Sequence, residues 1–321
     1  MEIELKRVQT RKWMERPMII GIVVAIPLFL FIGLNFRQLY MRLAWSNEAR
    51  LLERQAGHLS DVYANPAPGE DLFTDGLSSD FWDFMIINGA GKVSNASTWH
   101  AVEAIIQDGL ILRHLPDPDF RDETSESRKP AAERYNNVTL IGGRGYQPTQ
   151  SEDVVLTFTA RSSESFYGSA GVVVQPMGTL QEDGHFTKPF DMFGFSVIGA
   201  ESSLAEVSGP LCYLALNWAP GPVLPLQIDP SDWHTYELRL HRVNKIKWLG
   251  SIAVDGIEMC QIPMPAFGPV EVQVWSDNYL ITSTPQQLWE ISPALNVDFQ
   301  DGGDKEFELK MIRIHTERIS D

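Results

Sequence analysis

The chain has 321 residues, of which 42 are acidic and 26 are basic, so its formal net charge is −16 at pH 7. This balance argues against a nucleic acid partner, because binding of a phosphate backbone depends on Lys and Arg. The acidity lies beyond residue 54, where 17 basic and 37 acidic residues remain. A segment of that length is sufficient for one large β-domain.

A basic N-terminal segment, residues 1–16, precedes a run of 20 uncharged and mostly apolar residues, 17–36. A helix of this length spans about 30 Å of hydrocarbon, which predicts a single transmembrane helix and membrane lipid as a partner. A cleaved signal peptide is the alternative, but its apolar core is shorter and ends at a small-residue cleavage site. Five Lys or Arg precede the run and three follow it, which predicts a cytoplasmic N-terminus and an extracytoplasmic C-terminal domain.

Residues 37–69 are predicted to form a stalk helix followed by a Pro-rich linker. The stretch 37–58 lacks proline and spaces leucines among charged residues, which is typical of a helix. Residues 63–69 contain two prolines and a glycine and would end it. The apolar side of this helix is a candidate contact for other membrane-protein subunits.

The pattern changes between residues 70 and 321. Ten or more short runs rich in Val, Ile, Phe and Tyr alternate with clusters of Gly, Pro, Asn and Asp. This predicts a mainly β domain, built as a two-sheet antiparallel jelly-roll sandwich. The strongly polar segment 116–134 is predicted to be an exposed, mobile insertion. Cys212 and Cys260 are either one disulfide of an exported domain or two buried thiols on neighbouring strands.

Three segments occur in an order that resembles the concanavalin A-like lectin/glucanase superfamily. They are an opening Asp-Leu-Phe-Thr-Asp-Gly stretch within 71–82, a Trp-His-Thr-Tyr segment at 233–236 followed by Val-Asp-Gly at 254–256, and a closing strand at 307–315. The resemblance spans nearly the whole domain. It implies two stacked antiparallel sheets, of which the concave one often binds sugars.

The resemblance does not extend to catalysis. Laminarinase-like glycoside hydrolases of this superfamily carry E-x-D-x-x-E on one strand, which places two carboxylates beside the sugar bond. This chain has no such run, and its nearest acidic pair, Glu201 and Glu206, has an odd spacing within a loop-like stretch. The sequence therefore predicts a domain that is not an enzyme, with a glycoside hydrolase as the least favoured alternative.

One strand, 270–275, is the centre of a candidate sugar site. Alternation places three valines on one face and Glu271, Gln273 and Trp275 on the other, where they offer an acceptor, an amide and an aromatic plate. Neighbouring polar residues could join them if the strands are adjacent. The full candidate set is Trp275, Gln273, Glu271, Asp277, Asn278, Tyr213 and Asn217. The alternative is an ordinary polar face with a single surface tryptophan.

An acidic run before the closing strand is a candidate calcium site. Asp298, Asp301 and Asp304 surround two glycines, and calcium prefers such oxygen ligands. The resemblance also implies a structural calcium near this strand. The alternative is an acidic turn without metal. No other cofactor is expected.

These patterns predict a membrane-anchored, extracytoplasmic, non-catalytic module that binds carbohydrate or mediates adhesion. The alternative is a structural accessory subunit of a multi-protein membrane complex, with the jelly roll as a docking surface. A sugar-binding module predicts an open aromatic groove on the concave sheet. An accessory subunit predicts that this face is filled or covered.

Overall fold

The computed structural model describes most of the β-domain and part of the segment before it. The described residues are seven positions between 43 and 54, then 63–88, 102–114, 137–164, 168–182, 187, 191–199, 204, 207–216, 219–277, 279–282, 290–293 and 305–319. The seven positions between 43 and 54 are helical. The predicted transmembrane helix 17–36 and insertion 116–134 lie outside these ranges. Within them, no helix is long and apolar enough to cross a membrane, so the transmembrane helix stays a prediction.

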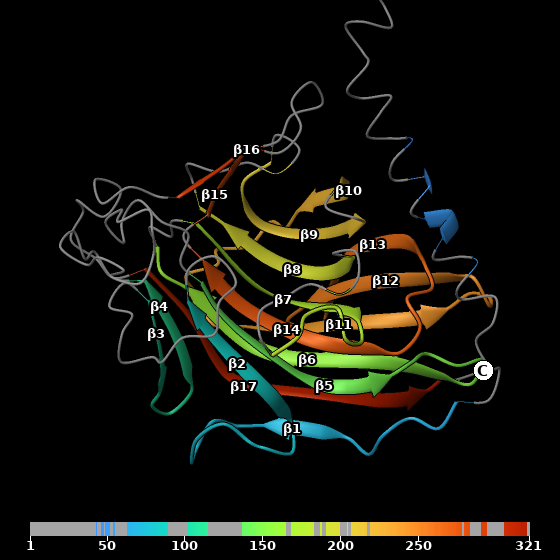
Figure 1. Ribbon diagram of the computed structural model, residues 1–321, viewed down its shortest axis with the longest axis horizontal. Coiled ribbons are helices and arrows are strands. Elements are labelled where there is room, and N and C mark those ends of the chain that lie inside the picture. Colours follow the sequence, from blue (N-terminus) through green and yellow to red (C-terminus); the bar gives the residue numbers. More distant parts are fainter. Residues whose placement is uncertain are drawn as a thin grey trace, which may run out of the picture.

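Two antiparallel sheets stack to form the sandwich that the sequence predicts (Figure 1). Sheet A has, in spatial order, β13 (Ile257–Pro265), β12 (Lys247–Val254), β11 (His234–Arg242), β6 (Glu152–Ser162), β17 (Lys305–Arg318), β4 (Leu110–His114) and β3 (Val102–Ile106), with β1 (Gly69–Asp71) paired to β17. Sheet B has β10 (Ala219–Pro225), β9 (Gly209–Leu216), β8 (Met192–Ile198), β7 (Ser169–Pro176), β14 (Val270–Asp277), β5 (Asn137–Tyr146) and β2 (Trp82–Asn88). A small hairpin, β15 (Tyr279–Thr282) and β16 (Glu290–Pro293), follows β14.

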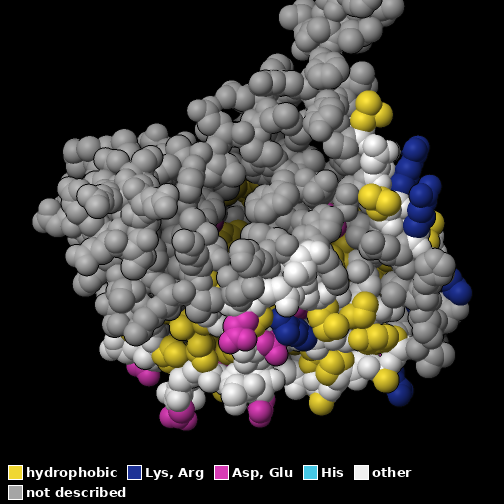
Figure 2. Space-filling view, in the orientation of Figure 1, with side chains coloured by type: hydrophobic (Ala, Val, Ile, Leu, Met, Phe, Trp, Pro, Cys, Tyr) yellow, Lys and Arg dark blue, Asp and Glu magenta, His cyan; other side chains and the backbone are white. Residues whose placement is uncertain are grey.

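The two sheets differ in how their faces are buried. In sheet A, β11 alternates between buried and partly exposed residues, as expected for a sheet with one face in water. In sheet B, every residue of β7, β8 and β14 is buried, so both faces of these strands are covered. Between the sheets, Tyr236 of sheet A packs against Phe195 of sheet B with ring centroids 4.3 Å apart. Figure 2 shows several separate Asp and Glu side chains at the lower left of this face, with hydrophobic side chains between and beside them.

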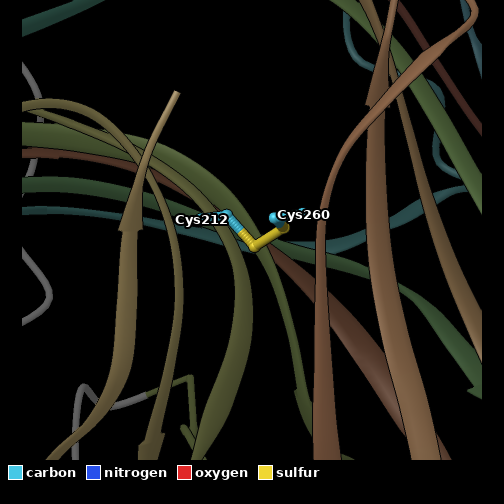
Figure 3. The surroundings of a disulfide bond; sticks show 2 residues. All are labelled: Cys212 and Cys260. Atoms are coloured by element: carbon cyan, nitrogen blue, oxygen red, sulfur yellow. A yellow bond between two sulfur atoms is a disulfide. The ribbon is translucent and has the colours of Figure 1, made fainter. Parts of the chain in front are cut away.

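A disulfide joins the two sheets, which resolves the alternative left open for the cysteines. Cys212 lies on β9 of sheet B and Cys260 lies on β13 at the edge of sheet A (Figure 3). Both residues belong to the core between the sheets.

The opening motif at 71–82 is held together by one buried carboxylate. Asp71 accepts hydrogen bonds from the backbone N–H of Phe73 (2.7 Å) and of Ser78 (2.9 Å), and from the indole Nε1 of Trp82 (2.7 Å). Phe73 has a φ of 52°, which an L-residue adopts at a cost. The motif therefore serves the fold, since Asp71 fixes the connection from sheet A to sheet B.

The Trp-His-Thr-Tyr and Val-Asp-Gly segments meet at one histidine. His234 Nδ1 lies 2.7 Å from Asp255 Oδ2, and its Nε2 lies 2.9 Å from the carbonyl oxygen of Asp229. Burial lowers the pKa of His234, but the hydrogen bonds to these two acceptors and the negative charge of Asp255 outweigh it and raise the pKa. Both ring nitrogens face acceptors, so a protonated imidazole that donates from each fits this position.

The predicted linker at 63–69 is bonded to the domain rather than standing free of it. The hydroxyl of Tyr63 donates to the carbonyl oxygen of Gly145 (2.8 Å). The amide of Asn65 donates to the carbonyl oxygen of Gln147 (3.1 Å) and accepts from its N–H (2.8 Å). The side chains of this stretch thus complete the hydrogen bonding at the end of β5.

Replacement of Asn65 by Ala is expected to lower the free energy of unfolding by about 2 kcal/mol, because it removes two partly buried hydrogen bonds of about 1 kcal/mol each. Urea unfolding of the full chain measures the change. Asn244→Ala is the matched control, since Asn244 also accepts two backbone hydrogen bonds but lies exposed in a turn. Equal losses in the two variants would show that 63–69 is not fastened as described.

Candidate functional site

The candidate site lies on the outer face of sheet B, which points away from sheet A. As predicted, β14 turns its valines toward sheet A, where Val270, Val272 and Val274 join the main core. Trp275 lies on the opposite face in a second apolar cluster that also contains Tyr213 of β9. β8 and β7 lie between β9 and β14 in the sheet, so the structure brings these two predicted residues to the same side of sheet B.

Several predicted site residues fall outside the part of the chain that the structure describes. These residues are Asn217, Asn278, Asp298, Asp301 and Asp304. Among the described residues, no group of three or more His, Cys, Asp or Glu side chains could hold a metal ion. The calcium site therefore stays a prediction.

The five described candidates are buried instead of lining an open groove. Their exposed fractions are 0% for Glu271, 5% for Gln273, 8% for Trp275, 5% for Asp277 and 5% for Tyr213. Alternation correctly predicts which face each residue takes, but it carries no information on what covers that face. In the part of the chain that the structure describes, these side chains therefore do not line the open aromatic groove predicted from the sequence.

Two chain segments account for part of this cover. Leu180, which follows β7, packs with Ile86 of β2 and Ile141 of β5 in a third apolar cluster. Leu204 and Val207, between β8 and β9, pack in the cluster that contains Trp275. Both segments are connections between neighbouring strands of sheet B, and each carries an apolar residue onto its outer face.

Both carboxylate oxygens of Glu271 already accept hydrogen bonds within the protein. Its Oε1 accepts from Gln175 Nε2 (3.0 Å), and its Oε2 accepts from the N–H of Gly178 (2.9 Å). Arg144 Nε lies 2.9 Å from Oε2 and 3.0 Å from Asp83 Oδ2, close enough for an ion pair but not aligned as a hydrogen bond. The Arg144 guanidinium thus lies beside a carboxylate that has no exposed area, as a buried acidic group requires.

Trp275 is fixed at both its edge and its face. Its indole Nε1 donates to Ser169 Oγ (3.2 Å), and that hydroxyl donates to Asp277 Oδ1 (2.9 Å). The ring passes over Gly171, where an added Cβ would lie 2.7 Å from Trp275 Cη2. Nearby, burial and then the negative charge of Asp277 raise the pKa of Tyr213. The aromatic plate is thus pre-oriented, although little of it is exposed.

Two amide oxygens on this face lack partners. Gln273 Oε1 and Gln175 Oε1 are both buried, and neither accepts a hydrogen bond. Buried polar atoms are normally satisfied, so two exceptions in one place call for an explanation.

Sequence reasoning missed Gln175 and Arg144 as neighbours of Glu271. The pairing of β7 and β5 with β14 brings them there, and sequence spacing does not reveal that pairing. The one local signal for Gln175 is its position as a polar residue directly after three valines.

Glu271 and Asp277 do not form a glycosidase pair. They lie six residues apart on one strand, which is about 20 Å at 3.3 Å per residue. Retaining and inverting glycosidases hold their carboxyl groups about 5–5.5 Å and about 6.5–9.5 Å apart, respectively. These two carboxylates therefore serve the local structure described above.

No protein-family model matches the chain, and no curated protein resembles it in sequence. Solved structures do resemble it. A β-1,3-1,4-glucanase (lichenase) from a mouse hindgut metagenome has 16% sequence identity and a TM-score of 0.45, over 78% of this chain and 99% of that one. The seed lectin of Lotus tetragonolobus has 8% identity and a TM-score of 0.40, over 74% and 100%. At these identities and TM-scores the likeness assigns the chain to no family.

The expectation that the domain is not an enzyme is corrected by the same comparison. Several of the matching structures carry the names of glycoside hydrolases, including the β-glucanase of Bacillus licheniformis, with 12% identity and a TM-score of 0.42 over 78% of this chain and 99% of that one. The expectation that the domain is not an enzyme rested on the absence of an E-x-D-x-x-E run from the sequence. That expectation is withdrawn in view of these neighbours. At such identities the likeness concerns the fold and assigns no activity to this chain.

Proposed function

We propose that this protein binds carbohydrate on the outer face of sheet B, around Gln273 and Trp275. The observation that carries the proposal is the unpartnered amide oxygen of Gln273, which is buried beside an oriented indole. An unsatisfied buried acceptor costs about 1–3 kcal/mol, which a sugar hydroxyl would recover by donating to it. The apolar ring of Trp275 offers a surface for the C–H face of the same sugar.

Access to this site requires the covering segment after β7 to move. The hydrogen bond from Gly178 to Glu271 and the packing of Leu180 hold that segment in place. Both contacts are modest, because one hydrogen bond contributes about 1 kcal/mol and one leucine about 1.5–3 kcal/mol. A ligand that reaches Gln273 would therefore bind more slowly than one that meets an open groove.

The proposed setting is outside the cytoplasm, with 17–36 as the membrane anchor. The disulfide supports it, since such bonds persist in oxidising compartments and are rare in the cytosol. The charge difference across 17–36 supports the same orientation.

A glycan array with the full-length chain tests the proposal. We expect the wild-type chain to be retained by at least one neutral glycan, and Gln273→Ala to weaken that binding by about 5- to 30-fold, as the loss of about 1–2 kcal/mol requires. Trp233→Ala is the control, because Trp233 lies partly exposed just before β11 of sheet A, between Arg161 and Lys310. Analysis of the bound glycan for cleavage shows whether binding leads to hydrolysis. Equal binding by wild type and Gln273→Ala would contradict the site.

An accessory subunit of a membrane complex is the second candidate. The low exposure of the outer face of sheet B favours it, since a docking scaffold needs no open groove. Gentle detergent extraction followed by native mass measurement distinguishes the two. A defined hetero-complex would favour this candidate, whereas a monomer or simple homo-oligomer would favour the sugar-binding module.

A further inference from the structure

We infer that Gln175 and Gln273 act together as acceptors for two hydroxyl groups of one bound sugar residue, and that Glu271 is the positioning residue that orients Gln175. This inference rests on the proposed carbohydrate-binding function. It assigns a role to Gln175, which the sequence did not single out. It also moves Glu271 from the group of ligand contacts to a supporting position.

The orientation of the Gln175 amide follows from its neighbour. The carboxylate of Glu271 accepts from the N–H of Gly178 and pairs with Arg144, so it faces donors, and the Gln175 atom 3.0 Å from its Oε1 is the donating nitrogen. The oxygen of the same amide then points away from Glu271, and it is the atom that lacks a partner. Gln175 Oε1 is therefore committed to accept.

The register of the strands sets the two acceptors close together. Glu271 of β14 lies opposite Gln175 of β7, and Gln273 lies opposite Val173. Gln175 and Gln273 are thus diagonal neighbours on the same face, a relation that corresponds to about 7–8 Å between backbones. Both side chains are long enough to reach one pyranose ring from that separation.

A pair of acceptors selects ligands by what they donate. A free hydroxyl can donate to an amide oxygen, whereas the same position carrying an O-methyl group cannot. The site should therefore prefer a glycan with free hydroxyls to its methylated form. Glu271→Gln should weaken this preference without removing any ligand contact, because an amide at 271 can donate to Gln175 Oε1 and turn the amide around.

Calorimetric titration of the full-length chain with a β-1,3-1,4-glucan tetrasaccharide, and with its O-methylated form, tests this inference. We expect wild type to bind the free form at least 10-fold more tightly than the methylated form. Gln175→Ala and Glu271→Gln should each lose most of that ratio. Gln261→Ala is the matched control, since Gln261 is an exposed glutamine on β13 of sheet A.

The outcomes separate this inference from the function on which it rests. If wild type binds the tetrasaccharide and Gln175→Ala binds it with the same affinity and the same ratio, the acceptor pair is wrong and the carbohydrate site stands. If wild type binds neither form, the proposed function fails for this glycan class and the acceptor pair fails with it. Should Glu271→Gln not fold, Gln175→Ala alone decides, because Gln175 bears no charge that the fold must compensate.

Discussion

Loss of the Cys212–Cys260 disulfide is expected to lower the free energy of unfolding by about 4 kcal/mol. The bond closes a loop across 48 residues, and in the chain-entropy description a loop of that length restricts the unfolded chain by this amount. For a domain of about 250 residues, a loss of this size lowers the melting temperature by about 8–16 °C. The bond also holds β13, at the edge of sheet A, against β9 of sheet B.

The clearest measurement compares oxidised and reduced protein. Urea unfolding of the wild type with and without a phosphine reductant gives the effect of the bond without changing a side chain. The double variant Cys212→Ala/Cys260→Ala should match the reduced wild type, apart from lost packing at two buried positions, and should not respond to the reductant. If reduction leaves the wild-type midpoint unchanged, the two sheets are held by packing alone.

Acidification from pH 6.5 to pH 4 is expected to lower the free energy of unfolding by about 3 kcal/mol, because of the protonation equilibrium of one buried histidine. His114 of β4 is buried, and burial lowers its pKa to about 4, although the interaction with Ser276 acts in the opposite direction. Its Nε2 lies 3.0 Å from Ser276 Oγ, and its Nδ1 has no partner. Between these two pH values the unfolded chain takes up a proton that the folded chain does not, so stability falls as the pH falls. A difference of about 2.5 pKa units corresponds to about 3 kcal/mol.

His114→Gln isolates this effect, since an amide can still bond to Ser276 and does not titrate. The variant should unfold at nearly the wild-type urea concentration at pH 6.5 and should be more stable than wild type at pH 4, because its stability changes much less between these two pH values. His234 titrates in a different window: its pKa is raised, so it stabilises the fold below pH 6.5 and loses this effect as the pH rises. His315, whose pKa is also lowered, is partly exposed and adds a smaller contribution of the same sign as His114. Parallel pH profiles for wild type and His114→Gln would contradict the assignment.

The architecture could be predicted from the sequence because it depends on local patterns. Alternation of apolar and polar residues locates the strands and gives the face that Glu271, Gln273 and Trp275 occupy. Three short motifs in the right order indicate the jelly roll. The structure shows what two of the motifs do: Asp71 and His234 bond the ends of strands together.

The environment of the site could not be predicted in this way, because it depends on contacts between distant residues. The sequence predicts Glu271 to be a free acceptor. In the structure its oxygens contact Gln175, Gly178 and Arg144, which lie 93 or more residues away along the chain. The sequence predicts an exposed indole at Trp275. In the structure Leu204 and Val207, from the connection between β8 and β9, pack in the same apolar cluster as this ring. Sequence alternation specifies a face of a sheet, but burial depends on what else folds onto it.

The most direct test of carbohydrate binding at the outer face of sheet B is to follow side-chain amide resonances of the full-length chain by NMR. Addition of the β-1,3-1,4-glucan tetrasaccharide should shift the resonances of Gln273 and Gln175 and the indole N–H of Trp275. The amide of Gln261 and the indole of Trp233, away from this face, should remain unchanged. Perturbation of Gln261 or Trp233 with no change at Gln273 would contradict the account, since it would place the sugar on sheet A.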